Sequence, residues 1–72
     1  MHFVINGQPR ELELPSETST VADVIQALAL KGDRVAIEHN GEIVSRSAWA
    51  ATPVAAGDRF EIVHFVGGGL PE

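Results

Sequence analysis

Apolar and polar residues alternate in short segments of this 72-residue chain, and this alternation predicts β-strands. Between two pairs of these segments stand Asn6-Gly7 and Asn40-Gly41, dipeptides that accept the positive φ angles of tight hairpin turns. The first turn stays open in length, since Gln8 and Pro9 fit either the loop or the strand. The sequence thus predicts two hairpins and a final strand, over residues 2–6 with 11–14, 35–39 with 42–44, and 59–66.

The period changes after Thr20, where four apolar residues follow the spacing of an amphipathic helix. Thr20 is suited to cap this helix, and Asp23 completes a capping-box pattern three residues later. Gly32 is expected at the left-handed position after the last turn, and Leu30 is expected to pack at the helix end. The apolar residues of the stripe are Val21, Val24, Ile25 and Leu28.

The order of hairpin, helix, hairpin, irregular crossover and final strand predicts an α+β fold. A final strand placed parallel to the first closes the sheet, which is the β-grasp (ubiquitin-like) arrangement of a mixed four- to five-stranded sheet packed on one helix. Trp49 is expected to hold the irregular crossover, residues 45–53, against the body of the domain. We expect a β-grasp domain at 1–66 and a flexible C-terminal tail at 67–72, made of three glycines and a three-residue extension.

Alternation also assigns faces to the strands, because residues two apart point to the same side of a sheet. Apolar residues in one phase are expected to meet the helix and form the core: Phe3, Ile5, Leu12, Leu14, Val35, Ile37, Phe60 and Ile62. The opposite phase leaves Val4, Val63 and Phe65 on the uncovered face, where together with Val66 at the strand end they are expected to form a partner-binding patch.

Composition removes several classes of function. The chain has no cysteine, and its ten acidic and five basic residues give a net charge of −5, which argues against binding to nucleic acid or anionic lipid. The N-terminus lacks the pattern of a signal peptide or membrane span, so a cytoplasmic location is expected. No metal site is expected either, because His2, His39 and His64 lack the spacing of a ligand pair. The serines lack a nucleophile-elbow pattern, which argues against a hydrolase. The chain is expected to be acted on by enzymes and not to be an enzyme itself.

Three consecutive glycines, Gly67 to Gly69, follow the last predicted strand. A phosphate-binding loop would have to open a helix, and a linker would have to join a second domain, so neither interpretation is favoured. A backbone without Cβ atoms can instead enter a narrow channel in a partner enzyme. The glycines therefore predict a carrier whose terminus is processed by other proteins.

The segment from Asn40 to Trp49, Gly57-Asp58-Arg59, and the ending from Val63 to Gly69 resemble the thiamin-biosynthesis sulfur carrier family, ThiS. This resemblance implies that an E1-like adenylating enzyme uses ATP to activate the carboxylate of Gly69, with Gly67 and Gly68 as the flexible approach. A cysteine desulfurase or another donor then supplies sulfur, and thiazole synthase consumes the resulting thiocarboxylate. No bound cofactor is implied for the carrier itself.

The chain departs from the family pattern at two places. Ser45 stands where the family usually has proline, and Leu70-Pro71-Glu72 follows the glycines, so Gly69 has no free carboxylate as the sequence is written. A precursor trimmed after Gly69 by a processing protease is the expected explanation, and residues foreign to the natural chain are the alternative. The small subunit of molybdopterin synthase and a ubiquitin-like protein modifier are the rival functions.

Overall fold

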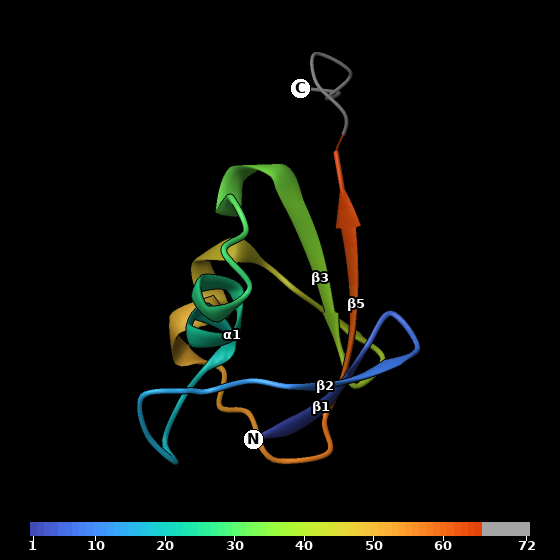
Figure 1. Cartoon of the computed structure of the whole chain (residues 1–72). Coiled ribbons are helices and arrows are strands. Elements are labelled where there is room, and N and C mark those ends of the chain that lie inside the picture. The colour runs from blue at the N-terminus through green and yellow to red at the C-terminus, as the bar shows by residue number, and fades with distance from the viewer. Residues whose placement is uncertain (66–72) are drawn as a thin grey trace.

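The computed structural model describes residues 1–65 and contains five strands in one mixed sheet, with one α-helix against its face (Figure 1). The sheet order is β2-β1-β5-β3-β4. Strands β1 and β5 run parallel, and the other neighbouring pairs run antiparallel, which confirms the expected β-grasp arrangement. The elements are β1 (His2–Ile5), β2 (Gln8–Glu11), α1 (Val21–Ala27), η1 (Gly32–Arg34), β3 (Val35–His39), β4 (Glu42–Val44), η2 (Arg46–Ala51) and β5 (Arg59–His64).

The first hairpin has a two-residue turn, so its second strand begins earlier than the alternation predicted. Asn6 and Gly7 have φ angles of 52° and 79°, and Ile5 pairs with Gln8 directly across the turn. The prediction of a strand over 11–14 was therefore wrong. Pro9 is tolerated in β2 because this strand lies at the sheet edge, where a missing N–H breaks no interior ladder. Leu12, just beyond β2, is nevertheless buried as expected.

The helix begins as expected and ends one turn earlier than expected. The Thr20 N–H donates to Asp23 Oδ2 at 2.9 Å, which satisfies a backbone donor at the N-terminus. At the other end the N–H of Ala29 donates to the Gln26 carbonyl and that of Leu30 to the Ile25 carbonyl, the pattern of a Schellman motif. Its left-handed position is held by Ala29, with a φ of 58°.

Gly32 was therefore placed wrongly as the end of the helix, because Ala29 takes the left-handed position one turn earlier. Gly32 instead opens the short η1 turn, where its missing side chain makes room for Trp49. A Cβ on Gly32 would lie 3.1 Å from Trp49 Cζ3, closer than ordinary van der Waals contact. The glycine is explained by packing and not by helix termination.

The core lies between α1 and the inner face of the sheet. Phe3 and Phe60 pack edge to face, with ring centroids 5.5 Å apart and an interplanar angle of 76°. Leu14 is partly buried and packs against this core. The other apolar residues assigned to the inner face and the helix stripe are buried, apart from the partly buried Leu28. The buried set is Phe3, Ile5, Leu12, Val21, Val24, Ile25, Val35, Ile37, Trp49, Val54, Phe60 and Ile62.

Trp49 holds the crossover between β4 and β5 against the body of the domain, as the sequence predicted. Its side chain is 7% exposed, and its indole N–H donates to the Val44 carbonyl at 3.0 Å. The crossover also contacts the start of the helix, because the Val21 N–H donates to the Thr52 carbonyl at 2.9 Å. Within residues 1–65, no helix combines the length and apolar character that crossing a membrane requires.

Candidate functional site

Strand β5 is the last described strand before the three glycines in the sequence, Gly67 to Gly69, which we call the glycine segment. Two hairpin turns hold β5 in place. The side chain of Asn6 accepts from the Ile62 N–H at 2.7 Å and donates to the Ile62 carbonyl at 3.2 Å. At the start of β5, Asn40 Oδ1 accepts from the Arg59 N–H at 2.9 Å. Both turn asparagines thus replace strand backbone as partners of β5, which fixes the strand from two sides.

The end of β5 is held by one further backbone hydrogen bond. The Phe65 N–H donates to the Arg34 carbonyl at 2.8 Å, so the last described residue is attached to the η1 turn. Val66 and the three glycines, Gly67, Gly68 and Gly69, lie outside the described residues, as does the Leu70-Pro71-Glu72 extension. Their predicted roles as patch member, flexible approach and sulfur-carrying residue remain predictions.

The sheet face opposite the helix carries exposed apolar side chains near the end of β5. Val63 is 58% exposed and Phe65 is 38% exposed, and Ala36 is the antiparallel partner of Val63. On β4, the edge strand that pairs with β3, Ile43 is 74% exposed. Ile43 points to this face because its partner Glu38 lies two residues from Ala36. We call Ala36, Ile43, Val63 and Phe65 the outer patch.

Val4 also lies on the outer face, but the structure separates it from Val63. Val4 is half-buried and pairs with Arg59, four residues before Val63 on the same strand, which is about 13 Å along β5. Glu61 lies between them on that face. Ile43 was not predicted because outward-facing residues were assigned only for the first and the last strand. Its signal was present in the alternation of Glu42, Ile43 and Val44.

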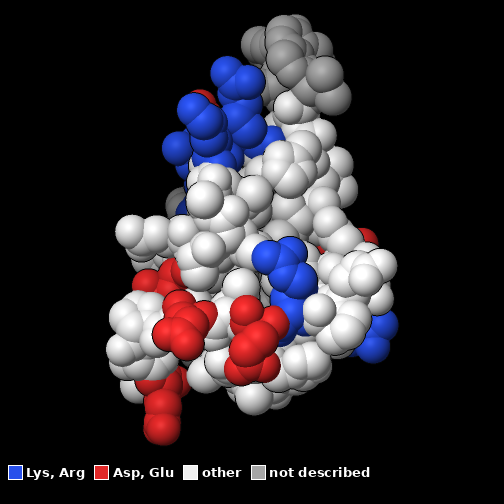
Figure 2. Space-filling view, viewed as in Figure 1, with Lys and Arg blue, Asp and Glu red and all other residues white. Residues whose placement is uncertain are grey.

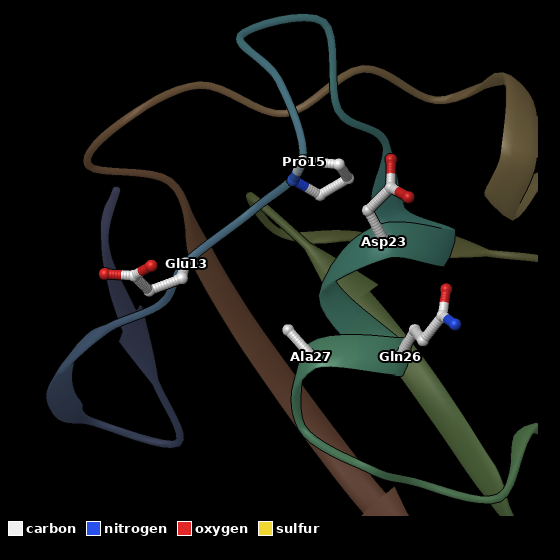
Figure 3. A pocket seen from close by; sticks show the side chains of 5 residues that line it. All are labelled: Glu13, Pro15, Asp23, Gln26 and Ala27. Carbon is white, nitrogen blue, oxygen red and sulfur yellow. The ribbon is translucent and has the colours of Figure 1, made fainter.

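A surface hollow of about 360 Å³ lies between the segment before the helix and α1 (Figure 3). The carboxylates of Glu13 and Asp23 on its wall point away from one another. The Asp23 carboxylate also accepts a hydrogen bond from the Thr20 N–H. A general acid and base would have to converge on one substrate, which this pair does not do. The hollow is lined by Glu13, Pro15, Asp23, Gln26 and Ala27.

The candidate site is therefore the end of β5 together with the outer patch. Among residues 1–65, no group of three or more His, Cys, Asp or Glu side chains could hold a metal ion. The pKa of Asp58 is lowered from its ordinary value, but this residue lies in the turn before β5, at the other end of that strand from Phe65. The site is an exposed apolar surface beside the end of the last strand, which suits docking to another protein.

Comparison with known proteins bears on this arrangement. The model of the ThiS family matches residues 3–69, so the match ends at the last of the three glycines. This chain belongs to the ThiS family. Among solved structures, the crystal structure of the thiamine biosynthesis protein ThiS from Geobacter metallireducens has a TM-score of 0.78 and 36% identity, covering 96% of this chain and 100% of that one. A solution structure from the same organism has a TM-score of 0.77 at the same identity, covering 100% of this chain and 92% of that one.

The curated relatives of this ThiS-family chain are of two lengths. The sulfur carrier protein ThiS of Bacillus subtilis is 32% identical over 65 residues, which cover 90% of this chain and 96% of that protein. Two thiazole synthases, from Paramagnetospirillum magneticum and Magnetococcus marinus, are 42% and 33% identical over 69 residues. The matched region covers 96% of this chain but 20% of each thiazole synthase. A ThiS-like region therefore occurs within longer thiazole synthase chains.

Proposed function

We propose that this chain is a sulfur carrier, and that it delivers sulfur as a thiocarboxylate on Gly69 for formation of the thiazole ring of thiamin. The observation that carries the proposal is that the ThiS family match runs through β5 and ends at Gly69. A sulfur carrier ThiS and two thiazole synthases are among the relatives, which links the family to this chemistry.

A carboxylate must be activated before sulfur can replace one of its oxygens. In the proposed sequence, a Gly69 oxygen attacks the α-phosphorus of ATP on an E1-like enzyme, and pyrophosphate leaves. The terminal sulfur of a persulfide from a cysteine desulfurase then attacks the carbonyl carbon, and AMP leaves. A thiol must reduce the resulting acyl disulfide by two electrons to release the thiocarboxylate, whereas a donor that supplies sulfide itself gives the thiocarboxylate directly. The carrier contributes its glycine backbone, which lacks the Cβ atoms that would block a narrow channel. ATP is bound by the activating enzyme and not by the carrier.

The proposal requires a free carboxylate on Gly69, whereas the sequence continues through Leu70-Pro71-Glu72. We propose that a protease hydrolyses the Gly69–Leu70 bond before activation. Intact-mass analysis of the protein from its native cell tests this step. A chain ending at Gly69 is expected, and a uniformly extended chain in cells that make thiamin would contradict trimming.

Adenylation is tested by the exchange of labelled pyrophosphate into ATP. The activating enzyme should catalyse exchange when supplied with the form ending at Gly69, and the full chain should give only background. The thiocarboxylated product should then support thiazole synthase and not molybdopterin synthase. Lysine-linked conjugates in cell extracts, detected by immunoblotting, would favour a protein modifier instead.

A further inference from the structure

Three of the five basic residues of this acidic chain lie at one end of the molecule. Lys31 and Arg34 lie at the η1 turn, and Arg46 begins η2. The two turns meet at Gly32, where a Cβ would lie 3.8 Å from Arg46 Nε. Figure 2 shows most of the basic surface at the end toward which β5 runs, and acidic surface at the opposite end. We call Lys31, Arg34 and Arg46 the basic cluster.

The basic cluster lies beside Phe65, the last described residue before the three glycines. The Arg34 carbonyl accepts from the Phe65 N–H at 2.8 Å, and the Arg34 N–H donates to the Lys31 carbonyl at 2.9 Å. Phe65 and Gly69 are four residues apart, a span of at most about 14 Å. Any protein that receives Gly69 in a channel must therefore place the channel entrance close to these cations.

The charge of the basic cluster is not neutralised within the described structure. All three side chains are exposed, and no carboxylate of residues 1–65 lies within salt-bridge distance of them. Counting Asp33, this end carries three cations and one anion, a net charge of +2. Within residues 1–65, the other two cations and eight carboxylates leave −6 on the rest of the described structure. Like charges held together repel one another, and an opposite charge on a partner would offset this repulsion.

We propose that the basic cluster docks against an acidic rim around the channel that receives the glycine segment in the activating enzyme. This inference rests on the proposed function. The charge separation favours a protein with a local acidic surface over nucleic acid, because the −6 on the rest of residues 1–65 would repel an extended polyanion. Complementary charge orients the approaching carrier with its glycine segment toward the entrance, which raises the association rate. At physiological ionic strength, salt largely screens such attraction at distances beyond about 8–10 Å.

Single charge reversals test the proposal because the chain supplies a matched control. Arg34→Glu and Arg46→Glu change the cluster, whereas Arg59→Glu makes the same change in net charge at the far end of β5, on another exposed arginine. Association with the activating enzyme is measured by stopped-flow fluorescence over ionic strengths of about 0.02 to 0.5 M. The full chain and the form ending at Gly69 are measured side by side. Thermal unfolding of each variant checks that the fold is retained.

The cluster reversals should slow association about tenfold at low salt and change dissociation little, and the difference should vanish at high salt. Arg34→Lys, which keeps the positive charge, should associate as fast as the unmodified protein. Arg59→Glu should slow association much less than the cluster reversals do. Equal slowing by Arg34→Glu and Arg59→Glu would overturn the proposal, because only net charge would then matter, and so would unchanged rates. Failure of the unmodified protein to associate would contradict the proposed function itself. Saturable binding of the chain to single-stranded RNA, abolished by the cluster reversals, would also overturn the assignment to a protein.

Discussion

His39 Nε2 lies 2.8 Å from Asp58 Oδ2, and this contact joins the end of β3 to the turn before β5. The side chains are 13% and 16% exposed, and the imidazole stacks on Phe60 with a centroid distance of 4.9 Å. Burial alone would raise the pKa of Asp58. Hydrogen bonds from His39, the Ala55 N–H and Asn40, with the charge of His39, outweigh burial and lower the pKa below its ordinary value of 3.8.

This contact predicts how stability depends on pH. Because folding lowers the pKa of Asp58, the ionised carboxylate stabilises the folded state at pH values above about 4, and this contribution disappears as the pH falls through the folded-state pKa. Asp58→Ala should therefore lower the free energy of unfolding by about 1–3 kcal/mol at neutral pH and by less in acid. Urea unfolding at several pH values measures both effects. Glu17→Ala, on an exposed loop, is the control, and a loss for Asp58→Ala that does not shrink toward low pH would contradict the assignment.

Ala29 occupies a strained backbone position, so a substitution there should stabilise the fold. It holds the left-handed position of the Schellman motif with a φ of 58°, where a Cβ is unfavourable. Ala29→Gly should raise the free energy of unfolding by about 1 kcal/mol.

Gly32→Ala should lower the free energy of unfolding by about 1–3 kcal/mol, because the new Cβ would lie 3.1 Å from Trp49 Cζ3. Chemical unfolding decides both, and a destabilised Ala29→Gly variant would show that the strain is absent.

Glu38 and Glu61 are directly opposite one another on β3 and β5, on the outer face of the sheet. Like charges at such positions destabilise a sheet. Glu61→Lys should therefore raise the free energy of unfolding by about 0.2–1 kcal/mol. The gain should shrink when unfolding is repeated in high salt, since screening weakens exposed charge interactions. A gain that persists in high salt would point to a cause other than charge.

The outer patch predicts a binding defect without a folding defect. Val63 is 58% exposed, so Val63→Asp removes little buried surface but places a charge beside Ala36 on the outer face. The dissociation constant for the activating enzyme should rise at least about tenfold, as measured by calorimetry. Gln26→Asp, on the exposed surface of α1, adds the same charge to the other layer and should bind normally. Unchanged affinity of Val63→Asp would remove the outer patch from the docking surface.

Much of the fold follows from local signals in the sequence. The second hairpin was predicted with its observed bounds, because Asn40-Gly41 permits few turn geometries and the flanking residues alternate clearly. The first hairpin was displaced because Leu12 and Leu14 continue an alternating pattern beyond β2. They contribute to the core from the segment after the strand, where burial does not require strand pairing.

Other features depend on contacts between distant residues. Gly32 looks like a helix terminus in sequence, yet its conformation and neighbours are decided by Trp49, seventeen positions later. The basic cluster was likewise invisible, because Arg46 joins Lys31 and Arg34 only when η1 and η2 meet. The separation of Val4 from Val63 required the parallel register of β1 and β5, which alternation alone does not determine. The glycine segment, in contrast, was recognisable from composition alone.

The central claim is that the carbonyl carbon of Gly69 carries sulfur. The form ending at Gly69 is incubated with the activating enzyme, ATP and a sulfur donor, with the sulfur carrier ThiS of Bacillus subtilis as a positive control, and each product is weighed intact. Our account predicts a mass gain equal to one oxygen-to-sulfur exchange in the form ending at Gly69, and none in the full chain. If the control gains sulfur while the form ending at Gly69 does not, the account is contradicted.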